Sequence, residues 1–289
     1  ADTAYPPTAC SMALVPRCAM PDARALSMAR TWLDVLVRIM ADDARRAAMV
    51  ADLVHPKWLL MLVRPGLARD DVPLVLEFVG MLLSTSPSLA QNWTRLGGFR
   101  VLERTLPPHW DVPCVLPWMW TLLLGPHAPK SSLYHTFAHA TAVAHPQALR
   151  VIVQCMAHGM MACRTAPAKR RASLPHIPAP PPGLTALEDS VRLLVVHSHN
   201  EDVRALLMLA PTLVAVLRAT APCFVDEPCG PRVCALCDAL VDMLAACIAE
   251  LVLSSHTLTL LHNLHAVAMP TSDPLIQSRL CTAVYIPLL

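Results

Sequence analysis

Apolar residues recur along this chain at spacings of three and four, the period of an amphipathic helix. After Asp22, a plausible N-cap, Leu26, Ala29, Leu33, Leu36 and Met40 fall on one helical face. Further apolar runs are separated by proline, glycine or a capping Asp or Ser, as short helices with sharp ends would be. The pattern predicts an all-α protein. Helices are expected at about 22–40, 43–55, 58–64, 71–85, 86–96, 99–106, 111–124, 131–141, 146–163, 184–198, 201–209, 212–220, 232–253, 257–268 and 274–285.

A repeat at a spacing of 40 residues is the strongest pattern in the sequence. The segment DVPLVLEFVGMLLS begins at Asp71 and DVPCVLPWMWTLLL begins at Asp111, and seven of the fourteen aligned positions are identical. This period is typical of armadillo and HEAT repeats, in which helical hairpins stack and bury a continuous core. We therefore expect an armadillo/HEAT-like helical solenoid.

Each copy of the repeat carries its own start signal. Asp71 and Asp111 are expected to cap their helices, with the proline of Asp-Val-Pro in the first turn. Pro117 would then lie inside the second helix, where a proline costs roughly 3 kcal/mol or bends the helix. We expect a kink there.

A proline-rich basic segment divides the chain. Residues 166–183 hold six prolines and no sustained apolar period, which indicates an extended linker or loop. The expected organisation is a helical repeat region at 1–165, the linker or loop at 166–183, and a continuation of the solenoid at 184–289. Whether the two helical regions form one continuous solenoid stays open.

The composition favours a buried, non-catalytic chain. Apolar residues make up 55% and charged residues 15%, and the net charge of +2 gives no case for nucleic acid. No Walker A, GxGxxG or GxSxG pattern is present, and eight glycines leave little material for phosphate-binding loops. We expect no enzymatic activity and no cofactor.

The cysteines and histidines leave one rival interpretation open. Eleven dispersed cysteines are expected to be small buried hydrophobes of a cytoplasmic, reducing compartment. Cys234 and Cys237 nevertheless have metal-ligand spacing, without a matching second pair. The alternative is a metal-binding or catalytic all-α domain that uses residues 223–265. A second rival, a membrane-embedded helical protein, is disfavoured because the longest stretch without Asp, Glu, Lys or Arg, 251–272, is too polar.

Two candidate sites follow from the side chains. Ser173 lies two and three residues after Arg171 and Arg170, a spacing suited to basophilic kinases, so it is a candidate phosphosite. Five tryptophans fall between Trp58 and Trp120; most should be core residues. Trp110, Trp118 and Trp120 are the candidates for partner contact, since tryptophan is enriched at interaction hot spots.

The region from Lys57 to Gly125 resembles the armadillo-like helical region of BEACH-domain (beige/Chediak-Higashi) proteins, of the fungal beige protein homologue type. The residues that carry the resemblance are Trp58-Leu59-Leu60, Leu82-Leu83, Ser86-Pro87, Gly97-Gly98-Phe99, Leu102, Leu106-Pro107, His109-Trp110, Val112-Pro113 and Leu123-Leu124-Gly125. It implies a protein-interaction and spacer segment of a very large cytosolic scaffold, acting in vesicle trafficking, lysosome or vacuole biology, or autophagy. Its partners would be proteins and the rest of a larger parent chain, from which both ends of this sequence look cut. Peripheral association with endomembranes would occur only through other domains, and the resemblance implies no catalytic residues.

Overall fold

The computed structural model describes residues 23–64, 66–128, 130–165, 183–209, 212, 215–216 and 231–252. These parts of the chain are mostly helical and contain no strand, which confirms the all-α prediction. The longer helices of the described chain are α1 (Ala23–Asp42), α2 (Ala44–Leu53), α4 (Val72–Thr85), α7 (Val115–Leu124), α9 (Ala148–Thr165), α11 (Leu184–His197) and α14 (Pro231–Val252). The shorter ones are α3 (Pro56–Leu62), α5 (Pro87–Arg95), α6 (Gly98–Thr105), α8 (Leu133–Phe137), α12 (Glu201–Leu207) and the 3₁₀ turns η1 (Arg69–Asp71) and η2 (Pro107–His109).

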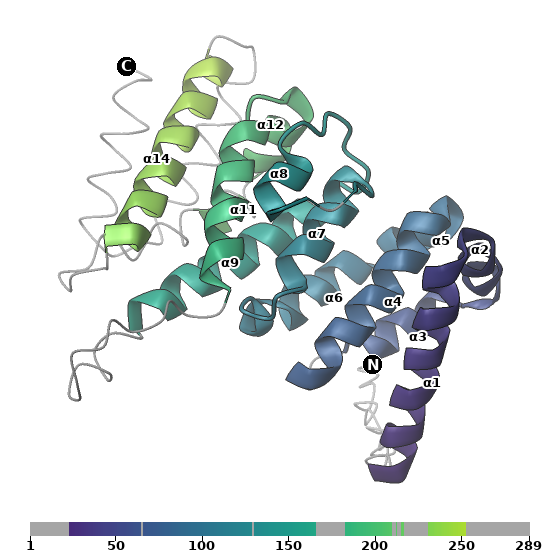
Figure 1. The fold of residues 1–289 in the computed structure, drawn as a ribbon. Helices are drawn as coiled ribbons and strands as arrows, with labels where there is room; N and C mark the ends of the chain where they lie inside the picture. The colour runs from purple at the N-terminus through teal and green to yellow at the C-terminus, as the bar shows by residue number, and fades with distance from the viewer. Residues whose placement is uncertain are drawn as a thin grey trace, which may run out of the picture.

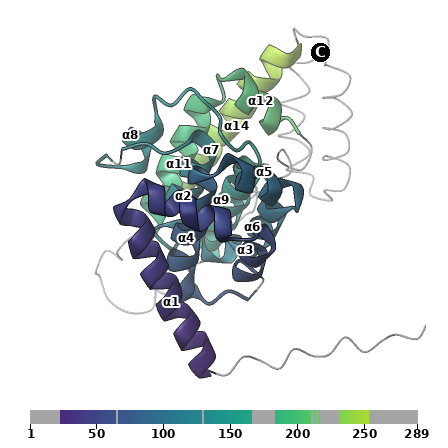
Figure 2. The same ribbon diagram turned by 90° about the vertical axis from the view of Figure 1, so that its right-hand side faces the viewer.

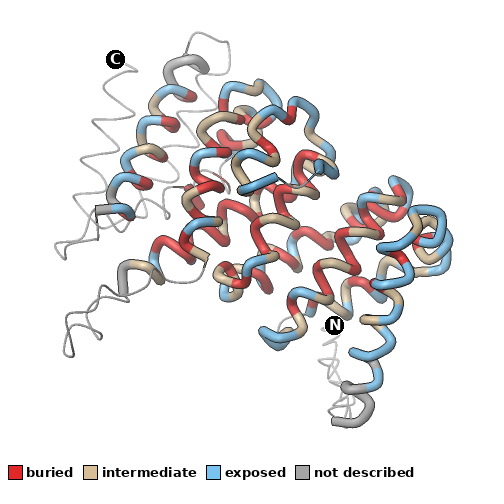
Figure 3. The backbone as a smooth tube through the Cα atoms, in the orientation of Figure 1, coloured by how far each residue is buried: buried red, intermediate tan, exposed pale blue. Residues whose placement is uncertain are grey.

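Helices that are distant in sequence lie side by side in one succession. Helix α1 packs against α4, α4 against α7, α7 against α9 and α11, and α11 against α14 (Figure 1). The buried residues follow the facing sides of these helices, while exposed residues line the outer sides (Figure 3). Since α9 contacts both α11 and α14, the described parts of the two helical regions pack together.

Polar contacts join parts of the chain that are distant in sequence, and four of them lie between residues 55 to 70 positions apart. Side-chain hydrogen bonds also join five pairs of residues that are 40 to 47 positions apart. They are Arg30 to the Asp70 carbonyl, Arg69 to Asp111, Thr105 to the Val63 carbonyl, Arg150 to Glu103 and Arg232 to Glu188. Part of the packing thus recurs at a sequence separation close to the 40-residue spacing of the repeat.

The local start signals are correct for two helices. The Asp43 carboxylate accepts a hydrogen bond from the Arg45 amide at 2.8 Å and caps α2. The Ser86 hydroxyl accepts one from the Leu89 amide at 3.3 Å and caps α5. In both cases the cap satisfies an amide that has no partner within the helix.

The start signals of the repeat are correct only in part. Asp71 lies immediately before α4 and Pro73 lies in the first turn, as predicted, but the Asp71 side chain makes no capping hydrogen bond. In the second copy, α7 begins only at Val115, four residues after Asp111. Asp111 instead forms two 2.7 Å hydrogen bonds with the Arg69 guanidinium. A forked guanidinium pair of this kind is stronger than a neutral amide bond, so the carboxylate joins two repeats rather than capping one.

The later start of α7 also changes the position of Pro117. It is the third residue of the helix, not an interior one. The amides of the first turn have no intrahelical partner to lose, so proline is tolerated there without the expected kink.

Several predictions fall outside the described residues. These are the linker at 166–182, the helices at 257–268 and 274–285, and most of the one at 212–220. Within the described parts, no single helix has both the length and the apolarity to cross a bilayer; α4 with η1 and α5 would pass only as a pair bent by 115°.

Candidate protein-interaction site

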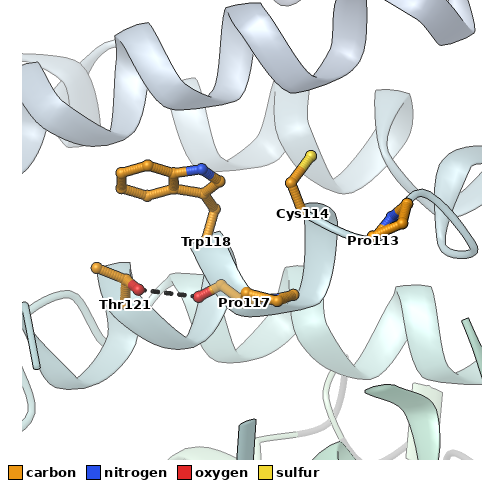
Figure 4. A pocket seen from close by; sticks show the side chains of 5 residues that line it. All are labelled: Pro113, Cys114, Pro117, Trp118 and Thr121. Carbon is orange, nitrogen blue, oxygen red and sulfur yellow. Dashed lines mark hydrogen bonds between the residues drawn. The ribbon is translucent and has the colours of Figure 1, made fainter. Parts of the chain in front are cut away.

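A shallow hollow lies along α7 and the turn that precedes it. Pro113, Cys114, Pro117, Trp118 and Thr121 line it and enclose about 280 Å³ (Figure 4). Spacings of three and four place these residues on one side of the helix. The Thr121 hydroxyl donates to the Pro117 carbonyl at 2.9 Å, so its polar atom is satisfied within α7. The hollow therefore offers a largely apolar lining with one indole.

Trp118 is positioned by a glycine of the neighbouring helix. A Cβ added to Gly80 of α4 would lie 2.6 Å from Cζ3 of the Trp118 ring, far inside van der Waals contact. The indole thus lies directly on the α4 backbone and is half-buried. Of the three tryptophans predicted to contact a partner, Trp118 is the one that borders this hollow, and its role there stays a prediction.

The other two candidates are core residues, and the prediction of partner contact is wrong for them. Trp110 is buried against Gly159 of α9, where an added Cβ would lie 2.8 Å from its ring. Trp120 is fully buried, and its Nε1–H donates to the Ser190 hydroxyl at 3.0 Å. The sequence does not reveal this, because the glycine and serine that receive the rings are distant in the chain.

The exposed tryptophans are others. Trp32 and Trp58 are 65% and 68% exposed. They belong to a group of eight large apolar side chains that are exposed on α1, α2 and α3. These are Met28, Trp32, Val35, Ile39, Met49, Leu53, Trp58 and Met61. The sequence contained a signal for the first four, since positions 28, 32, 35 and 39 keep helical spacing on a face separate from the core face.

Three of the five described cysteines are core residues, and the other two are partly buried. Cys155, Cys237 and Cys247 are buried, as predicted. Burial raises the pKa of Cys114 and of Cys163 to about 11, which disfavours their thiolates at neutral pH.

The described residues include only part of the rival metal site and do not include the candidate phosphosite. Among the described residues, no three His, Cys, Asp or Glu side chains are placed to share a metal ion. Residues 223–230 and 253–265 of the rival metal site lie outside those parts of the chain, as does Ser173.

One histidine is buried at the junction of α7, α8 and α11. The Nε2 atom of His197 lies 3.1 Å from the Phe137 carbonyl, and its ring centroid is 5.9 Å from that of Trp120. Burial lowers the pKa of His197, and the nearby positive charge of His127 lowers it further, against the opposing hydrogen bond to Phe137. The folded protein therefore holds this imidazole neutral below its ordinary pKa of 6.5.

This burial predicts an acid-sensitive stability. Above pH 6.5, His197 is neutral in both the folded and the unfolded chain and adds no pH dependence. As the pH falls below that value, His197 binds a proton in the unfolded chain while it stays neutral in the folded chain. The free energy of unfolding therefore decreases. Urea denaturation between pH 7.5 and 5 should show a shallower pH slope for His197→Gln than for the wild type. The exposed His139→Gln variant is the control and should keep the wild-type slope; equal slopes in all three proteins would contradict the assignment.

Comparison with known proteins yields no relative. No family model matches the chain, and neither a curated protein nor a solved structure resembles it significantly.

Proposed function

We propose that this chain is an armadillo- or HEAT-like α-solenoid that serves as a non-catalytic interaction and spacing segment of a large cytosolic scaffold. The observation that carries the proposal is the packing of α1 on α4, of α4 on α7 and of α7 on α11, with hydrogen bonds from Arg30 to the Asp70 carbonyl and from Arg69 to Asp111 that span 40 and 42 residues. In repeat proteins each unit contacts mainly its neighbours, and the resulting extended surfaces bind other proteins.

The exposed apolar surface supports an interaction role. Soluble monomers rarely leave several large apolar side chains exposed together, and such groups mark contact sites. Here Trp32 on α1 and Trp58 on α3 are both exposed, and the Trp118 hollow lies farther along the succession. Tryptophan side chains of this kind are the usual anchors of protein interfaces.

The proposed setting is vesicle trafficking, lysosome or vacuole biology, or autophagy, and it is supported by the resemblance to BEACH-domain proteins. The residues of that resemblance lie on α3 to α7 and include core positions such as Leu59, Leu83 and Leu102. They are packing and turn residues, so they support a shared architecture, and the cellular role follows from it.

Proximity labelling of the intact parent protein tests this function. We compare the natural protein with one in which residues 23–252 are replaced by an unrelated helical-repeat segment of similar length. If the segment recruits partners, labelled neighbours from endosomes, lysosomes, vacuoles or autophagosomes should be lost on replacement. An unchanged set of neighbours would contradict the interaction role and leave spacing alone.

A further inference from the structure

Helix α1 carries a second apolar face that nothing in the described chain covers. Met28, Trp32, Val35 and Ile39 are 63%, 65%, 39% and 39% exposed and follow one another at spacings of four, three and four. This is the spacing of a helix–helix contact seam. Together the four side chains expose on the order of 400 Å² of apolar surface, in the range of the largest patches on monomers.

This outer face of α1 points away from α4. Arg30 approaches Asp71 at 3.4 Å, and Asp34 borders a hollow shared with Leu74 of α4. At about 100° per residue, Arg30 lies about 200° around the helix from Met28, and Asp34 lies the same angle from Trp32. The apolar seam is therefore on a different side of α1 from the one that faces α4. Figure 2 looks toward this end of the molecule, with α1 and α2 in front.

Helices α4 and α7 carry side chains with the same spacing as the outer face of α1, and on these helices the side chains meet another helix. Helices α1, α4 and α7 each carry three side chains at spacings of four and three, with an aromatic residue in the middle. The triplets are Met28-Trp32-Val35, Leu74-Phe78-Met81 and Cys114-Trp118-Thr121. The second and third are aligned by the 40-residue repeat.

Two of these triplets face the preceding helix of the succession. Leu74 borders the hollow that α4 shares with α1, and Trp118 lies on Gly80 of α4. The triplet of α1 has the same spacing and a central aromatic residue, and it lacks such a neighbour among the described residues. Its position continues an interface that the chain already uses twice.

We propose that the outer face of α1 binds one amphipathic α-helix of a protein partner, packed as α1 packs on α4. The contact between Trp118 and Gly80 indicates the chemistry of this helix. It has apolar residues at spacings of three and four and a glycine or alanine at the centre, so that the Trp32 indole can lie on its backbone. The inference rests on the proposed interaction function and names the class of partner.

A second copy of this chain fits the same face less well. The exposed seam of α1 contains only large side chains, so in a two-fold pairing each Trp32 would meet Val35 or Ile39 rather than a small residue. The contacts inside the succession are also head-to-tail, joining two different helix faces, whereas a two-fold dimer joins identical ones.

The probe is a hydrocarbon-stapled, fluorescently labelled helical peptide with the sequence of residues 72–85, which already receives an indole in the folded chain. Stapling is needed because an isolated helix of this length is marginal in water. Anisotropy titration with the intact protein should show saturable binding. Trp32→Ala should weaken it at least tenfold, as expected for an aromatic hot spot, and a peptide with Gly80→Leu should bind at least tenfold more weakly.

Matched controls distinguish binding at the outer face of α1 from nonspecific hydrophobic binding elsewhere on the protein. Leu96→Ala and Leu209→Ala remove exposed apolar side chains elsewhere and should leave binding unchanged. The proposal is overturned if the peptide does not bind, or if Trp32→Ala or the Leu-containing peptide binds as well as the original.

Other occupants of the face give distinct results, each of which overturns the proposal. They are a dimer in sedimentation analysis that Trp32→Ala dissociates, binding to anionic vesicles that Trp32→Ala abolishes, and peptide binding that requires removal of residues 1–22. Because the titration uses this chain alone, its failure leaves the proximity-labelling result, and with it the proposed function, to be judged separately.

Discussion

Replacing Trp120 with alanine should lower the free energy of unfolding by about 3–5 kcal/mol, the usual cost of deleting a buried tryptophan. Its side chain has no exposed surface, and its indole N–H donates to Ser190 at 3.0 Å. The substitution opens a large cavity beside α11 and leaves the buried Ser190 hydroxyl without its partner. Urea denaturation followed by far-UV circular dichroism measures the loss.

The chain offers a matched control for this substitution. Trp58→Ala removes the same side chain from a position that is 68% exposed, and the free energy of unfolding should change by no more than about 0.5 kcal/mol. Trp120→Phe keeps much of the packing but removes the hydrogen bond to Ser190, and an intermediate loss of about 1–3 kcal/mol is expected. Equal losses for Trp120→Ala and Trp58→Ala would show that Trp120 is not a core residue.

The boundaries set by neighbouring residues could be predicted from the sequence. Asp43 and Ser86 cap their helices because the amides that they accept from lie two and three residues away. Asp71 and Asp111 carry the same apparent signal but do not cap. For Asp111 the competing partner is Arg69, 42 residues away. A pattern of neighbouring residues cannot predict a contact at that separation.

The burial of the tryptophans also depends on contacts that are distant in sequence and could not be predicted. Which indole is buried depends on which neighbouring helix offers a glycine, and the receiving residues of Trp118 and Trp110 are Gly80 and Gly159. Neither glycine stands out in the sequence. Trp32 differs, because α1 carries two apolar stripes and the described residues bury only one of them.

The repeat gains a physical meaning from these contacts. Five of its seven identical positions, such as Val75 and Val115, are buried core residues in both copies. Phe78 and Trp118, which differ between the copies, are the aromatic centres of the triplets at the helix–helix contacts. The core is thus repeated, while the contact between successive helices is adjusted by the size of one ring and of the residue that receives it.

That adjustment predicts that Gly80→Ala destabilises the protein by about 1–3 kcal/mol, the cost of overpacking a filled interface. Alanine would ordinarily stabilise the interior of a helix by about 0.5–1 kcal/mol relative to glycine. Here its Cβ would lie 2.6 Å from Cζ3 of Trp118, and the ring, held between α4 and α7, must shift. The measurement is the midpoint and slope of urea denaturation.

The partner substitution should reverse the sign of this effect. With Trp118→Ala, the indole no longer occupies the space above Gly80, so the added Cβ meets no ring. In that background Gly80→Ala should stabilise the protein by about 0.5–1 kcal/mol through the helix preference alone. The double-mutant cycle isolates the coupling between the two positions, because the effects that each substitution has independently of the other cancel in the cycle. If Gly80→Ala costs the same free energy with and without Trp118, the indole does not lie on α4, and the packing rule from which the helical partner of Trp32 was inferred fails with it.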